Sequence, residues 1–350
     1  MWPKSRDKTP KQFLKLFEGK TLIEITADRI HKFIDWDKIF CITVSNAYKK
    51  EIIKYVPQLY EENIIVEPLR RDSGPAHALG AVYILRKDPD AVIINAAADH
   101  LISPERKFIK AMMVAAEAAF KGDYLVAVGI KPFYPHTGMG HIKRGERFEV
   151  IEGNVVYKLE AFIEKPELSL AKRFTRSSKY YWNANQYVWR ADSLLKAIKK
   201  YAKDINYGID KISGAIGTSD ENEVIMREYR RMPKLSIDYA VSEKAKNFLL
   251  VVARYNWTDI GDWNEVWKHM PKDYLGNVII DGDSPGGEVI NIDTTDALIH
   301  TDGRLIAVVD MDNIVIVDCE DVLLVCPKSR AQSVKKIVNK LKEDNRKDLL

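Results

Sequence analysis

The sequence predicts an α/β protein with a doubly wound, mostly parallel sheet, followed by a small C-terminal all-β module. From residue 39 to residue 130, short Val- and Ile-rich runs alternate with helical segments, as in parallel sheets covered on both faces. After residue 274 the pattern changes to short apolar runs punctuated by Gly and Asp. The chain has 350 residues, 46% hydrophobic and 30% charged, which is ordinary for a globular protein of one large and one smaller domain.

The elements of the larger domain follow from local patterns. Apolar, β-branched runs bounded by turn residues predict strands, here at residues 39–44, 63–68, 91–96 and 125–130. Apolar residues at helical spacing predict the intervening helices, at residues 48–56, 75–86 and 105–120. Residues 138–190 are expected to form longer antiparallel strands around a helix at 169–174, and helices predominate from residue 191 to residue 248.

The C-terminal part is predicted from its short, nearly regularly spaced apolar runs. These runs, which indicate either a short β-helix-like module or a sandwich, are residues 277–280, 297–299, 305–309, 313–317 and 322–325. We therefore expect a large α/β domain at residues 1–272, the β module at 273–330 and an amphipathic C-terminal helix at 331–350.

Composition argues against several classes of partner. A net charge of +4 is small for this length, so nucleic acid is not expected, and no apolar run is long enough to cross a membrane. The three cysteines lack metal-ligand spacing and each lies in an apolar run, which predicts buried thiols in a reducing cytoplasm. No Gly-x-Gly-x-x-Gly follows a strand, which disfavours a Rossmann dehydrogenase. The sequence does not determine the oligomeric state, and a homodimer is one of the possibilities.

Two acids stand out because each closes an apolar run. Asp99 follows the run at 91–98, and Asp259 lies in the segment 255–263. In open α/β sheets, strand ends face the crevice where ligands bind. Two carboxylates can hold one Mg²⁺ together with phosphate oxygens. The alternative for each is a helix or turn cap.

Several loops combine glycine, proline, basic and hydroxyl residues directly after a strand. Residues 67–76 could bind a ligand at a helix N-terminus, or form a capped turn with Ser73 as N-cap. Glu164 and Lys165 could contact a sugar hydroxyl and a phosphate, or form an exposed ion pair. Residues 129–142 could bring backbone close to a ligand, and Asn183, among aromatic residues, suits hydroxyl recognition. A plain hairpin and a packed aromatic cluster are the respective alternatives.

In this order and spacing, these pieces resemble the sugar-1-phosphate nucleotidylyltransferases, and most of all their mannose-1-phosphate guanylyltransferase (GDP-mannose pyrophosphorylase) branch. The resemblance covers nearly the whole chain. The matching pieces are WPKSR (2–6), PKQF (10–13), EPLRRDSGPA (67–76), ADH (98–100), GIKP (129–132), TGMG (137–140), FIEKP (162–166), WN (182–183), SIDY (236–239), EK (243–244) and WTDIGDW (257–263).

The resemblance implies a nucleotide-diphospho-sugar transferase fold and transfer of a guanylyl group from GTP to mannose 1-phosphate. It implies that two acids hold Mg²⁺, that three basic residues neutralise phosphates, that three residues line the guanine pocket and that three read sugar hydroxyls. The implied metal ligands are Asp99 and Asp259, and the implied basic residues are Lys11 and Arg6 for pyrophosphate and Lys165 for the sugar phosphate. The implied guanine-pocket residues are Arg71, Ser73 and Pro75. The implied sugar-reading groups are Glu164, Asn183 and the Gly138 amide. The attacking phosphate is already ionised, so no general base is needed.

The sequence departs from the family pattern at two informative places. The family has a strand and a Gly-rich, triphosphate-binding loop before the WP segment, and here Met1 directly precedes Trp2. We therefore expect the sequence to be an N-terminally truncated version of the working protein. Asn185 stands where the family usually has glycine or another small residue, a mild change because Asn tolerates left-handed backbone. The alternatives are an enzyme using another base or hexose and a catalytically silent nucleotide-sugar-binding paralogue, which the missing loop would favour.

Overall fold

The computed structural model describes residues 1–17, 19–282 and 284–350, and these residues divide into two compact units. Unit 1 contains Met1–Asp28, Ala98–Leu101 and Thr258–Leu350. Unit 2 contains Arg29–Ala97 and Ile102–Trp257. The first 28 residues thus belong with the β module, so the units do not follow a single boundary near residue 272.

A six-stranded mixed sheet forms the centre of unit 2, in the order β5-β10-β7-β11-β9-β8. Its strands are β5 (Val92–Ile94), β7 (Leu125–Ile130), β8 (Gly140–Ile151), β9 (Asn154–Ile163), β10 (Tyr180–Arg190) and β11 (Phe248–Val252). β7 and β11 are parallel and the other pairs are antiparallel. A separate parallel pair joins β3 (Cys41–Thr43) to β4 (Ile64–Val66). The sheet therefore carries more antiparallel pairing than the alternation of strands and helices predicts.

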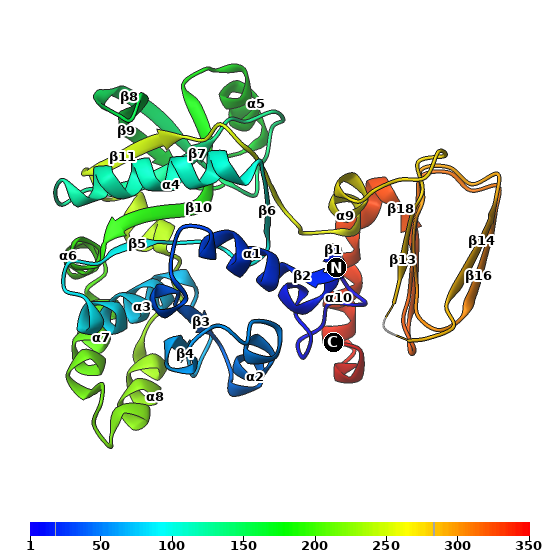
Figure 1. Ribbon diagram of the computed structural model, residues 1–350, viewed down its shortest axis with the longest axis horizontal. Coiled ribbons are helices and arrows are strands. Elements are labelled where there is room, and N and C mark those ends of the chain that lie inside the picture. Colours follow the sequence, from blue (N-terminus) through cyan, green and yellow to red (C-terminus); the bar gives the residue numbers. More distant parts are fainter. Residues whose placement is uncertain (18, 283) are drawn as a thin grey trace. The chain divides into compact units, whose positions relative to one another are not determined.

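Helices cover both faces of this sheet, as the doubly wound prediction requires. On β7, Leu125 and Ala127 pack in one hydrophobic cluster, whereas Val126 and Val128 pack in another. The second cluster lies under α4 (Glu105–Phe120), which Figure 1 shows running along the sheet. The first cluster includes side chains of the helices α3 (Ser73–Lys87), α6 (Ala191–Tyr201), α7 (Lys203–Ala215) and α8 (Glu221–Arg231). Unit 2 also contains α2 (Asn46–Tyr55) and α5 (Leu168–Arg176).

Unit 1 contains a β-helix-like stack of short strands, visible in Figure 1 as two facing layers. In one layer β13 (Val278–Asp281), β15 (Leu298–Thr301) and β17 (Ile314–Asp318) are parallel, and β18 (Leu323–Pro327) is antiparallel to β17. The other layer pairs β14 (Glu288–Ile292) with β16 (Leu305–Val309), again in parallel. Parallel pairing of every second strand favours the β-helix interpretation over the sandwich, whose sheets are antiparallel.

The core of unit 1 joins the start of the chain to its β module. Trp2 and Leu16 pack in the same hydrophobic cluster as Trp263 and Val315. The segments involved are β1 (Lys15–Phe17), β2 (Lys20–Thr21), α9 (Trp263–His269) and α10 (Val334–Glu343). The helix α1 (Leu22–His31) continues from unit 1 into unit 2.

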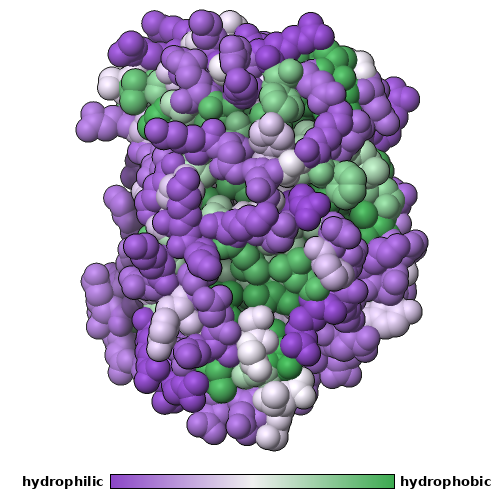
Figure 2. Space-filling view, turned by 90° about the vertical axis from the view of Figure 1, so that its left-hand side faces the viewer, coloured by the Kyte–Doolittle hydropathy of each residue, from purple (hydrophilic) through white to green (hydrophobic). Residues whose placement is uncertain are grey.

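Sequence patterns locate some elements better than others. Helix α4 and strand β7 have the predicted bounds, whereas α1, β11 and β14 were not predicted. Of the cysteines predicted to be buried, Cys319 is buried, and Cys41 and Cys326 are half-buried. Among the described residues, no helix combines the length and apolar character needed to span a bilayer. On the face seen in Figure 2, hydrophilic side chains predominate and hydrophobic ones form separate patches, one of them near the centre of the view.

Candidate active site

In unit 1 the predicted metal ligands lie at the two sides of one lysine. Lys11 Nζ is 3.0 Å from Asp99 Oδ2 and 2.7 Å from Asp259 Oδ1. Lys11 begins the short helix η1 (Lys11–Phe13), Asp99 lies in the turn before β6 (His100–Ser103), and Asp259 ends β12 (Asn256–Asp259). The Ile260 amide donates to the Asp99 carbonyl at 3.2 Å, which fixes the two acidic segments side by side.

In this arrangement two carboxylates share one cationic group, the Lys11 ammonium. Burial alone would lower the pKa of Lys11, but Asp99 and Asp259 together raise it above its ordinary value. The donor set fits Mg²⁺, which prefers one or two carboxylates and takes its remaining ligands from phosphates and water. Among the described residues no group of three His, Cys, Asp or Glu side chains could hold a metal, so a metal here would depend on such outside ligands. The metal role of the two acids stays a prediction.

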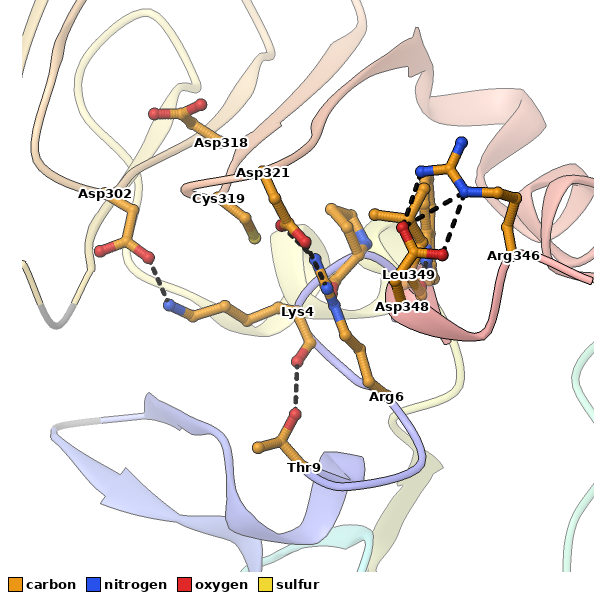
Figure 3. Close-up of polar contacts among 12 residues, drawn as sticks. Lys4, Arg6, Thr9, Asp302, Asp318, Cys319, Asp321, Arg346, Asp348 and Leu349 are labelled. Atoms are coloured by element: carbon orange, nitrogen blue, oxygen red, sulfur yellow. Dashed lines mark hydrogen bonds and ion pairs between the residues drawn. The ribbon is translucent and has the colours of Figure 1, made fainter. Parts of the chain in front are cut away.

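Arg6, predicted with Lys11 to neutralise pyrophosphate, has other partners. Its guanidinium donates to both oxygens of Asp321, at 2.7 and 2.5 Å, and its Nε donates to the Pro3 carbonyl at 2.9 Å. Figure 3 shows Arg6 directed at Asp321, and near it Lys4 paired with Asp302. The structure therefore does not bring Arg6 to the Lys11 site, because its charge is used to hold the N-terminal segment on the β module.

In unit 2 the predicted sugar-binding side chains of Glu164 and Asn183 lie against one glycine. A Cβ at Gly140 would be 2.5 Å from Glu164 Oε2 and 3.3 Å from Asn183 Cβ. In the register of the sheet, Gly140 is also the direct partner of Asn183. The absence of a side chain at this position is therefore what admits the Glu164 carboxylate beside Asn183. The importance of Gly140 was not predicted, although it ends the quoted TGMG motif.

Asn183 belongs to a hydrogen-bonded group that includes three residues given no role from sequence. Asn183 Nδ2 donates to Asp238 Oδ1 and to Tyr187 Oη, both at 2.9 Å. Tyr187 in turn donates to Asp238 Oδ1 at 2.6 Å and accepts from Ser242 Oγ at 3.0 Å. Asp238 and Ser242 are the ends of a π-helical turn, η4 (Asp238–Ser242). The SIDY motif signalled this segment, but only the fold shows its contact with Asn183.

Charge near Glu164 is dominated by acids. Only 7% of its side chain is exposed, and Lys165 Nζ lies 3.2 Å from its Oε1. Burial, with a further contribution from Asp238, raises the pKa of Glu164 above its ordinary value. The hydrogen bond with Glu164 raises the pKa of Lys165, whose side chain is 57% exposed and remains accessible to a phosphate.

The Gly138 amide, also predicted to read a sugar hydroxyl, already has a partner. It donates to His136 Nδ1 at 3.0 Å, and Gly138 is exposed. A hydroxyl would have to displace His136 to reach it. Asn185 has a φ of 53°, in the left-handed region that asparagine tolerates.

The residues predicted to line the guanine pocket are bonded within unit 2. Arg71 donates to the carbonyls of Tyr229 and Arg230, at 2.7 and 2.8 Å. Ser73 Oγ accepts from the Ile237 amide at 2.9 Å, and Pro75 is buried. The N-cap of α3 is Asp72 rather than Ser73. These contacts tie the 71–75 loop to residues 229–237, and a guanine contact stays a prediction.

A buried acid, Glu67, lies at the start of the same loop. The Tyr229 hydroxyl donates to Glu67 Oε1 at 3.1 Å. Burial raises the pKa of Glu67 to about 7, despite the opposing effect of this hydrogen bond. Glu67 is the first residue of the EPLRRDSGPA motif, but the burial of its side chain could not be predicted from the sequence.

Fold and site together define a nucleotidyl transferase. The nucleotidyl transferase family matches residues 1–274, and a mannose-phosphate isomerase/GMP-like β-helix domain matches residues 287–341. A mannose-1-phosphate guanylyltransferase of Klebsiella pneumoniae is 32% identical over 353 residues, covering 99% of this chain and 72% of the relative. The mannose-1-phosphate guanylyltransferase RfbM of Salmonella typhimurium is 34% identical, with coverages of 99% and 71%. The chain therefore belongs to the nucleotidyl transferase family and, within it, to the mannose-1-phosphate guanylyltransferases.

A solved structure agrees with this assignment. A Thermus thermophilus protein described as a mannose-1-phosphate geranyltransferase superposes with a TM-score of 0.83 at 28% identity. The superposition covers 98% of this chain and 95% of that one, so both units have counterparts there.

Proposed function

We propose that this protein transfers the guanylyl group of GTP to mannose 1-phosphate, giving GDP-mannose and pyrophosphate. The observation that carries the proposal is the site of Lys11, Asp99 and Asp259, which joins three distant parts of the sequence at one cation-binding point. The names of the guanylyltransferase relatives supply the substrates.

The chemistry requires positioning and charge neutralisation rather than proton transfer. Asp99 and Asp259 would hold Mg²⁺, which would supply Lewis acidity and a template for the phosphates. Lys11 would neutralise the departing pyrophosphate once the lysine is released from Asp99 and Asp259. While it is paired with Asp99 and Asp259, its raised pKa keeps this ammonium charged.

The sugar phosphate would be recognised in unit 2. Lys165 would neutralise its phosphate, and Glu164 and Asn183 would accept hydrogen bonds from its hydroxyls. The 71–75 loop would form part of the guanine pocket through those of its groups that are not used in the hydrogen bonds described above. The three cysteines are free thiols, which supports a cytoplasmic location.

Pyrophosphate release by the purified protein, followed for each nucleoside triphosphate paired with each common hexose 1-phosphate, tests this proposal. We expect the highest kcat/KM for GTP with mannose 1-phosphate, and a requirement for a divalent cation. A different best pair would reassign the base or hexose. Tight binding of GDP-mannose without turnover of any pair would instead indicate a nucleotide-sugar-binding protein.

A further inference from the structure

We propose that Asp238 is a positioning residue that fixes the Asn183 carboxamide so that it accepts, and cannot donate, a hydrogen bond from the substrate. The inference rests on the proposed function for the identity of the substrate. It adds the direction of one hydrogen bond and the residue that imposes it.

The orientation of the amide follows from the chemistry of its neighbours. An ionised carboxylate can only accept hydrogen bonds, and Asp238 Oδ1 lies 2.9 Å from the Asn183 amide nitrogen. The Tyr187 hydroxyl, which is 2.9 Å from the same nitrogen, uses its proton on Asp238 at 2.6 Å. Turning the amide over would place Asn183 Oδ1 against two oxygens that have no proton to offer it. The neighbours therefore select one of the two amide orientations.

Tyr187 cannot relax this constraint. Its hydroxyl donates to Asp238 and accepts from Asn183 and from Ser242. Burial raises its pKa well above the ordinary value, so the hydroxyl keeps its proton over the whole working pH range. Its ring is fully buried, which leaves no room for another orientation.

The atom of the Asn183 carboxamide that is left for a substrate is its oxygen, a hydrogen-bond acceptor. Among the described residues, Asn183 Oδ1 receives only the Asn185 amide, at 3.3 Å, and a carbonyl oxygen has two lone pairs. Glu164, which lies against the same Gly140, is also an acceptor when ionised. This part of the site is thus suited to a sugar ring whose hydroxyls donate, and it disfavours rings in which fluorine or an ether oxygen replaces the hydroxyl.

Steady-state kinetics with monodeoxy and monofluoro derivatives of mannose 1-phosphate test the proposal. In the wild-type protein we expect one ring position at which both replacements lower kcat/KM about 10- to 100-fold, because fluorine cannot donate. In Asp238→Asn the new amide can donate or accept a hydrogen bond, so the Asn183 carboxamide can adopt either of its two orientations. The preference for hydroxyl over fluorine should then fall at least threefold. A preference equal to that of wild type in a folded Asp238→Asn protein would overturn the proposal.

A reciprocal exchange separates orientation from simple loss of structure. Asn183→Asp places two carboxylates in contact and should lower kcat/KM at least tenfold. Adding Asp238→Asn restores a donor–acceptor pair and leaves an acceptor facing the substrate, so most of the loss should be recovered together with the hydroxyl preference. No recovery would count against the proposal. Ser242→Ala, which removes a donor from the same group without touching Asn183, is the matched control and should keep the preference.

Hydrogen exchange of the Asn183 side-chain amide gives a readout independent of turnover. Its two protons should exchange slowly in the wild-type protein and at least tenfold faster in Asp238→Asn, as followed by NMR. Fast exchange in the wild-type protein would overturn the orienting role of Asp238. If the wild-type protein turns over no sugar 1-phosphate, the proposed function fails, and this measurement alone decides whether Asp238 orients Asn183.

Discussion

In unit 1 the acids Asp99 and Asp259 share one lysine, whereas in unit 2 Asp238 is held by the neutral donors of Asn183 and Tyr187. The first arrangement depends on opposite charges, and a different cation could replace the ammonium without rebuilding the site. The second depends on the direction of individual hydrogen bonds and leaves no exchangeable ion. The comparison contrasts a pair of acids that holds a cation with a single acid that orients uncharged groups.

The largest expected effect is loss of the acids in unit 1. Asp99→Asn and Asp259→Asn should each lower kcat about 100-fold or more, because each removes a charged ligand from the proposed metal site. Pyrophosphate release at saturating Mg²⁺ measures this. Asp302→Asn is the matched control, since Asp302 is ion-paired with Lys4 on the β module, and it should retain activity. Near-normal turnover in either of the first two variants would contradict a shared metal.

Replacing the exposed cation of unit 2 should have a smaller, selective effect. If Lys165 neutralises the sugar phosphate, Lys165→Ala should raise KM for mannose 1-phosphate roughly 10- to 100-fold and change KM for GTP much less. Lys165→Arg, which keeps the charge, should recover part of the loss. Equal effects on both substrates would show that Lys165 does not act on the sugar phosphate.

Glu67 provides a pH-dependent contrast with the ion-paired acids. Its pKa is about 7 in the folded protein, because burial favours the neutral form, against an ordinary value of 4.5. The folded state therefore holds a proton that the unfolded state loses, and this contribution to stability falls as pH rises from 4.5 to 7. The free energy of unfolding of the wild-type protein should therefore decline by on the order of 1–3 kcal/mol as the pH rises, and Glu67→Gln should remove this decline. Urea unfolding of both proteins at pH 5 and pH 8 measures it, and parallel curves would refute the assignment.

The smallest effect is expected at the Arg6–Asp321 pair. If Arg6 only holds the N-terminal segment, Arg6→Ala and Asp321→Ala should destabilise the protein by a similar amount, about 1 kcal/mol, and leave KM for pyrophosphate in the reverse reaction nearly unchanged. A large rise in that KM in Arg6→Ala alone would restore Arg6 to the phosphate site.

Sequence patterns predicted the α/β class, the β module and several element bounds because local periodicity carries that information. They did not predict partners that depend on distant contacts. Arg6 was predicted to bind phosphate because its guanidinium suits an anion, but that guanidinium is bonded to an acid 315 residues away. Asp238 and Gly140 stood in recognised motifs, yet their importance comes from a strand register and a side-chain bond that no local pattern specifies.

The discontinuous make-up of unit 1 has a consequence for the order of folding. Unit 2 comes almost entirely from one stretch of chain, whereas Lys11 must wait for Asp259, 248 residues later. At roughly 5–20 residues per second of synthesis, that delay is on the order of tens of seconds. During this time the first residues, including Trp2, whose indole finally donates to the Leu349 carbonyl at 2.8 Å, have no native partners from the β module. The cation site should therefore form only after nearly all of unit 2 has been synthesised, and the contacts of the N-terminal segment with the β module should form later still, which leaves that segment exposed to proteases in the meantime.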